Sequence, residues 1–228
     1  MDAEYVVIGS SLFGLAILLG GLAARGLVQY ARQRIRPQLL WGSGLALAAA
    51  AVAIEAIVFV GIVVPVLLQT YLFLSAAIVG VLSLGATRIL RHARVEAIYT
   101  VWAVASMAGV AALCFVTPAP DSLVVGGIIS GNPPLPVLVV SSLVTGPATI
   151  LLLSASYLSL KRNWRWQTVL MAAGAVILGA GGTLYIASFP VALYYAEFLG
   201  IFCLFLGIVS LPQSSASHLP TAAPDPSG

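Results

Sequence analysis

Apolar stretches long enough to cross a membrane as helices recur along the whole chain. A transmembrane helix needs about 20 mainly apolar residues. Seven stretches meet this requirement, and short segments rich in arginine, proline or glycine separate them. Their approximate bounds are residues 4–24, 38–60, 65–87, 97–117, 135–159, 167–188 and 190–211. The pattern therefore predicts an all-α polytopic membrane protein with seven transmembrane helices.

The composition supports this class. Only 7% of the 228 residues are charged, whereas soluble domains carry about 25%, so the chain has too little charge to cover a solvated surface. We expect a multi-pass protein of the cell membrane, with the bilayer as its surroundings and possible protein partners within it. The transmembrane domain covers residues 1–211, and the Pro/Ser/Ala-rich residues 212–228 are expected to form a disordered cytoplasmic tail. The first stretch lacks the basic start of a secretory signal, so we expect it to be retained as a span.

The basic residues indicate the orientation of the spans. All ten lie in or beside the first, third and fifth predicted connections. They are Arg25, Arg32, Arg34, Arg36, Arg88, Arg91, Arg94, Lys161, Arg162 and Arg165. Because basic loops stay cytoplasmic, we expect the N-terminus outside and the C-terminus in the cytoplasm. Nucleic-acid binding is not expected, since it requires basic residues gathered on a soluble face.

Two carboxylates, Glu55 and Glu197, lie inside the predicted spans. In the predicted orientation, the second span runs outward and the seventh runs inward. At a rise of about 1.5 Å per residue, both carboxylates lie roughly 8–10 Å below the outer boundary of the membrane. A charge at the bilayer centre costs about 2.5–3.5 kcal/mol on insertion scales. We therefore expect both side chains to face the interior of the bundle rather than lipid.

Small residues share the helical faces of the two carboxylates. Gly44, Ala48 and Ala51 precede Glu55 at helical spacing, and glycines follow Glu197 in the same way. Small residues allow helices in a membrane to approach closely. The residues predicted to pack helices together are Gly44, Ala48, Ala51, Gly174, Gly181, Gly200 and Gly207.

Polar side chains at similar depth complete a candidate site, and two interpretations of it stay open. The candidates for ligand or proton binding are Glu55, Glu197, Tyr71, Tyr194, Tyr185 and Gln69. One interpretation is a polar chamber that binds a cation, a proton or a small polar ligand. The other is that each glutamic acid is protonated and hydrogen-bonded to Tyr or Ser, which ties helices together. Two carboxylates without histidine suit a hard cation at most, so no metal site is predicted.

Several cofactors lack the residues that they need. The only histidines are His92, in a predicted cytoplasmic loop, and His218, in the tail. Histidine-ligated haem and a Ser–His pair in the membrane are therefore not supported. Retinal requires a buried lysine for its Schiff base, but the only lysine is Lys161, in another cytoplasmic loop. We expect no cofactor.

Two blocks of the chain, residues 39–90 and 161–209, carry several short sequence motifs. The motif residues are Trp41, Glu55, Tyr71, Leu84-Gly85, Gly181-Gly182 and Tyr194 with Glu197-Phe198-Leu199-Gly200. The set resembles an uncharacterised family of bacterial and archaeal membrane proteins with seven transmembrane helices. The resemblance implies the same order of spans and places both glutamates within family motifs, but it implies no activity. The chain departs from the family at Gly61-Ile62-Val63, where the family has a Gly-Trp-Ser turn.

Three classes of function follow from these features. The favoured class is a structural or accessory subunit of a membrane complex, because the loops are short and no soluble domain is evident. The alternative is a sensor or carrier that uses Glu55 and Glu197. A carrier usually contains repeats or broken helices, and the only hint of one is the Thr-Gly-Pro stretch at residues 145–147, in which Pro147 frees the carbonyl of Leu143. An intramembrane enzyme is least favoured, because no nucleophile–base pair is evident.

Overall fold

Five long helices form the part of the protein that the computed structural model describes. That part comprises residues 3–33, 36–90, 93–125, 127–129, 133–162, 166, 169–170, 172–174, 176–177, 199–203 and 206–207. The helices are α1 (Ala3–Gln33), α2 (Arg36–Phe59), α3 (Pro65–Leu90), α4 (Ala93–Val116) and α5 (Leu135–Arg162). Each contains a segment long and apolar enough to cross a membrane. The protein is thus an almost entirely helical, membrane-embedded chain.

The predicted sixth and seventh spans lie largely outside the described residues. Helical residues occur at 172–174 within the sixth and at 199–203 within the seventh. The predicted tail, residues 212–228, is likewise outside the described part.

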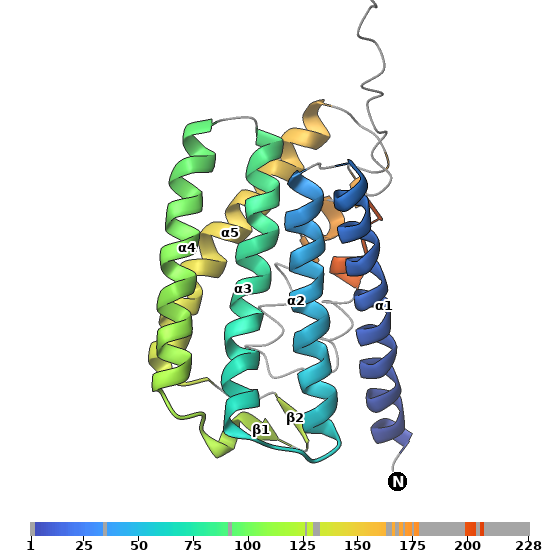
Figure 1. Ribbon diagram of the computed structural model, residues 1–228, viewed down its shortest axis with the longest axis vertical. Coiled ribbons are helices and arrows are strands. Elements are labelled where there is room, and N and C mark those ends of the chain that lie inside the picture. Colours follow the sequence, from blue (N-terminus) through green and yellow to red (C-terminus); the bar gives the residue numbers. More distant parts are fainter. Residues whose placement is uncertain are drawn as a thin grey trace, which may run out of the picture.

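The first four helices stand side by side in chain order, and each runs opposite to its neighbour (Figure 1). Helix α5 crosses obliquely behind them (Figure 1). It approaches α4 where Val140 contacts Gly109. Further along, Leu152 and Ala155 pack with Trp41 of α2 and with residues of α3. The tilt of α5 therefore brings together helices that are distant in sequence.

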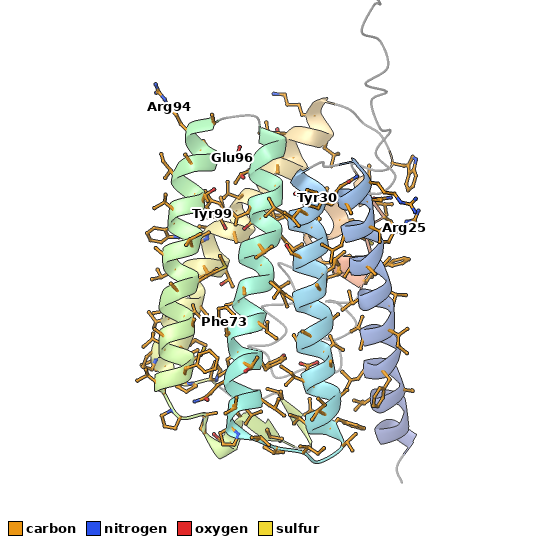
Figure 2. All side chains as sticks on the ribbon, in the orientation of Figure 1. Arg25, Tyr30, Phe73, Arg94, Glu96 and Tyr99 are labelled. Carbon is orange, nitrogen blue, oxygen red and sulfur yellow. The ribbon has the colours of Figure 1, made fainter. Side chains whose placement is uncertain are left out.

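The described basic residues gather at one end of this bundle, which we call the basic end. Arg25 and Arg94, on α1 and α4, lie towards this end (Figure 2). Lys161 lies in the last turn of α5, at the same end. The opposite end, which we call the hairpin end, holds the N-terminus and the α2–α3 turn (Figure 1).

Helix boundaries follow local chemistry. Gly61 has a φ of +96°, and it ends α2 in a Schellman motif. In this motif the Gly61 N–H donates to the Val58 carbonyl at 2.9 Å, and the Ile62 N–H donates to the Ile57 carbonyl at 3.2 Å.

Proline suits the first position of a helix, and Pro65 begins α3. Helix α1 continues to Gln33, beyond the predicted end of the span at residue 24, because Arg, Leu, Gln and Ala favour helix.

A short β-hairpin occupies the α4–α5 connection, where the sequence indicated only a Pro/Gly loop. A 3₁₀ turn (η1, Asp121–Leu123) leads into β1 (Val124–Val125), which pairs antiparallel with β2 (Ile128–Ile129). Gly127 has a φ of +80°, which permits the tight turn between the strands. Because Leu123 and Ile129 are buried against helices, the hairpin closes this end of the bundle.

Three groups of buried side chains hold the helices together. The hairpin-end core comprises Ala51, Ile54, Val58, Leu68, Leu72, Leu74, Ala76, Val110, Cys114, Leu123, Ile129, Val137 and Val144. The α1–α2 core comprises Leu12, Leu15, Leu19, Ala23, Leu45, Ala48, Val52, Ala56, Phe59 and Ile201. The basic-end core consists of two small clusters, Trp41, Leu82, Ala86, Leu152 and Ala155 in one and Tyr99, Ala103 and Ala148 in the other.

Glycines allow α2 and α3 to approach closely. A Cβ atom on Gly85 would lie 2.5 Å from Nε1 of the buried Trp41, and a Cβ atom on Gly44 would lie 2.6 Å from Cδ2 of Leu82. Both distances are too short for a real side chain. The indole of Trp41 and the side chain of Leu82 therefore fill the space that a larger residue would need.

Replacing Gly85 by alanine is expected to destabilise the protein. The added methyl group forces Trp41 out of its packed position, and such overpacking costs about 1–3 kcal/mol. Gly14→Ala is the matched control, because a Cβ atom there meets nothing within 4 Å and alanine favours helix over glycine by about 1 kcal/mol. Thermal unfolding in detergent should show a loss for Gly85→Ala and none for Gly14→Ala. Equal unfolding temperatures would contradict the close α2–α3 contact.

Candidate functional site

Helix α2 holds Glu55 in the interior of the bundle. Its side chain is 5% exposed, and it is the one buried acidic or basic residue in the described part of the chain. It lies four residues before the end of α2, roughly 6 Å along the helix axis. A carboxyl group is thus buried close to the hairpin end.

Glu55 lies between two of the packed cores. Residues three and four positions away share a helical face. On one side of that face, Ala51 and Val58 belong to the hairpin-end core, which includes α3, α4 and α5. On the other side, Val52 and Phe59 belong to the α1–α2 core. The carboxyl group therefore projects where the two cores meet.

The packing of α2 on α3 sets Tyr71 level with Glu55. In two antiparallel helices, the residue numbers of facing positions have a constant sum. This sum is 126 for the contact of Gly44 with Leu82 and for that of Trp41 with Gly85. Residue 55 is therefore opposite residue 71. Tyr71 is half-buried and packs against the hairpin-end core. Glu55 and Tyr71 thus lie at corresponding positions of adjacent helices.

Gln69, another predicted site residue, links two helices. Its Nε2 donates a hydrogen bond to the backbone carbonyl of Thr117, at 3.2 Å. Thr117 directly follows α4, whose last carbonyls have no partner within the helix. This contact makes Gln69 a cap for α4. Its role in binding a ligand stays a prediction.

The remaining predicted site residues are only partly described. Glu197, Tyr194, Tyr185 and Gly181 lie outside the described residues. The packing residues Gly44, Ala48 and Ala51 are buried, as are Gly174, Gly200 and Gly207. Ile201, four positions after Glu197 in sequence, belongs to the α1–α2 core. This contact brings the described part of the seventh predicted span against α1 and α2.

A buried polar link that sequence analysis missed connects α3 to α4. Ser83 Oγ lies 2.5 Å from the Tyr99 hydroxyl and donates to the Gly80 carbonyl at 2.8 Å. Because a serine hydroxyl has one proton, which goes to Gly80, Tyr99 is the donor to Ser83. Figure 2 shows Tyr99 on α4, beside α3. No spacing in a single sequence pairs these two residues, which lie on different helices.

A third link joins α4 to α5. The indole N–H of Trp102 donates to the backbone carbonyl of Leu143 at 3.1 Å. Sequence analysis identified this carbonyl as the one that Pro147 frees, but not its partner. Tryptophan carries a donor on a large apolar ring, so it can supply a hydrogen bond at a lipid-facing position.

Loss of the Ser83 hydroxyl is expected to weaken the bundle. Ser83→Ala leaves the Tyr99 hydroxyl buried without its acceptor, which costs about 1–3 kcal/mol. Adding Tyr99→Phe removes that unsatisfied group and should recover part of the loss. Ser75→Ala is the control, since Ser75 is exposed and bonds only within its own helix. Unfolding temperatures of the unmodified protein, Ser83→Ala, Tyr99→Phe and the double variant measure the coupling, and strictly additive losses would contradict the link.

The described residues contain no group of three or more His, Cys, Asp or Glu side chains that could hold a metal ion. No family model, curated protein or solved structure matches the chain. The chemistry of the site is therefore interpreted from its own residues. They provide one buried glutamic acid, a tyrosine opposite it on α3 and three side-chain links between helices.

Proposed function

We propose that the protein is a structural or accessory subunit of a membrane complex. Its seven spans place the N-terminus outside and the C-terminus in the cytoplasm, and Glu55 and Glu197 form a buried carboxylate pair in the outer half that ties helices together. The observation that carries this proposal is the burial of Glu55 between two packed cores. A carboxyl group in that position has helices on both sides to connect.

The other polar contacts support a role in tying helices. Gln69, Tyr99 and Trp102 each use a side-chain hydrogen bond to connect one helix to the next. The orientation is supported by the basic end, because basic segments stay cytoplasmic.

The alternative proposal is a sensor or carrier that binds a proton, a cation or a small molecule at Glu55 and Glu197. It is supported by the α2–α3 register, which sets residue 71 opposite residue 55. Tyrosine and glutamic acid both carry hydrogen-bonding groups that suit a small polar ligand. Native mass spectrometry of the purified protein separates the two proposals. A bound small molecule or cation would favour the sensor or carrier over a purely structural role.

Substitution of Glu55 distinguishes a tie, meaning a side chain that links helices by hydrogen bonds, from a group that binds a ligand. A glutamine retains hydrogen-bonding capacity, whereas a leucine does not. For a tie, Glu55→Gln should unfold close to the unmodified protein, and Glu55→Leu should lose about 1–3 kcal/mol. The measurement is thermal unfolding in detergent over a range of pH and with added mono- and divalent cations. Glu96→Gln is the control, because Glu96 is only half-buried, at the start of α4.

The pair itself is tested by combining Glu55→Gln with Glu197→Gln. Residues in contact give non-additive effects, whereas distant residues give additive ones. The proposal therefore predicts that the double variant differs from the sum of the single variants. Stability that responds to added cations in the unmodified protein, but in neither single variant, would replace the tie with the binding alternative. Full additivity without such a response would contradict both.

A further inference from the structure

Proline interrupts the hydrogen bonding of α5 near its middle. Pro147 lies inside the helix and has no N–H to give to the carbonyl of Leu143, four residues earlier. Gly146 precedes it, and a Cβ atom on Gly146 would meet none of the described residues within 4 Å. The helix therefore has a weak point between residues 143 and 147.

Leu143 lies where water cannot replace the missing donor. Its side chain is 47% exposed on the surface of an apolar helix. It lies eight residues into α5, roughly 12 Å along the helix axis. In the hydrocarbon of a bilayer, a carbonyl without a partner is costly, so the protein must satisfy it.

Trp102 supplies the missing donor from the middle of α4. Its Nε1 lies 3.1 Å from the Leu143 carbonyl oxygen. The indole is itself 45% exposed, so it does not fill a core position. This hydrogen bond does for Leu143 what the absent N–H of residue 147 would otherwise do.

The packing of α5 changes at the same point. Before the break, Val137 belongs to the hairpin-end core, and so does Val144 at the start of the break. After it, Ala148 packs with Tyr99 and Ala103, which flank Trp102 on α4. The two halves of α5 thus belong to different cores, and Trp102 donates its hydrogen bond to the last carbonyl before the break.

We propose that residues 143–147 are a hinge in α5 and that the Trp102 indole is the latch that holds it. With the latch in place, the two halves of α5 keep one relative direction. When the latch is lost, the half of α5 at the basic end shifts relative to the half in the hairpin-end core. The protein thereby contains a built-in conformational device at the surface that faces lipid.

Spin labels on either side of the break test the hinge. Val139→Cys and Tyr157→Cys suit this purpose, because both residues are exposed, at 51% and 67%. Cys114→Ala and Cys203→Ala remove the native thiols from the full chain, which is reconstituted in lipid nanodiscs. Pulsed electron paramagnetic resonance then measures the distance between the labels. We expect one narrow distance distribution with Trp102 in place and a second, shifted population after Trp102→Phe.

Pro147→Ala provides the matched control. Alanine restores an N–H four residues after Leu143, so the carbonyl no longer depends on the indole. Trp102→Phe should then leave the distribution narrow when Pro147→Ala is also present. If Trp102→Phe alone yields no folded protein, adding Pro147→Ala should restore the yield.

Three results would overturn the proposal. One is an unchanged distribution after Trp102→Phe in the presence of Pro147. Another is a second population that persists when Pro147→Ala is added, because the lost indole packing, rather than the carbonyl, would then be the cause. The third is a failure to fold that Pro147→Ala does not rescue.

Discussion

The absence of water in the hydrocarbon of a bilayer is the constraint on which this structure depends. A polar group in that region must find its hydrogen-bond partner within the protein. The bond from Trp102 to the Leu143 carbonyl meets this requirement between two helices. Hydroxyls such as those of Thr70 and Thr149 meet it within one helix, by donating to the carbonyl four residues earlier. Trp102, Thr70 and Thr149 thus each donate a hydrogen bond to a backbone carbonyl within the protein.

The same constraint explains the combination of small residues and polar links. Apolar side chains gain little by leaving lipid for another helix, so helices in a membrane associate through close packing and hydrogen bonds. Gly44 and Gly85 provide close packing between α2 and α3. Ser83 and Tyr99 provide a hydrogen bond between α3 and α4. Glu55 combines both features, since a carboxyl group lies on a face of small residues between two cores.

Much of the fold was predictable from the sequence because a bilayer imposes a fixed length on each span. Pro65 and Pro147 were informative, since proline has a defined effect on a helix wherever it occurs. The tilt of α5 and the hairpin at residues 124–129 were not predictable, because both depend on which buried side chains meet across the bundle. The extension of α1 to Gln33 was missed because hydropathy marks the edge of the membrane rather than the end of a helix.

The candidate site was predictable in part. The depth of Glu55 follows from its position in an apolar span. The partners of Gln69, Tyr99 and Trp102 depend on the register and tilt of neighbouring helices, which one sequence does not encode as a local pattern. The predicted partner of Glu55, Glu197, lies outside the described residues, so their contact stays a proposal.

The most direct test of this account is whether the two ends of α5 lie on opposite sides of the membrane. Single cysteines are introduced by Ser122→Cys at the hairpin end and Lys161→Cys at the basic end, both at exposed positions, in a chain carrying Cys114→Ala and Cys203→Ala. A membrane-impermeant maleimide is then applied to intact cells and to inverted vesicles. The account predicts that position 122 reacts in intact cells and position 161 only in inverted vesicles. Reaction of both from the same side would contradict it.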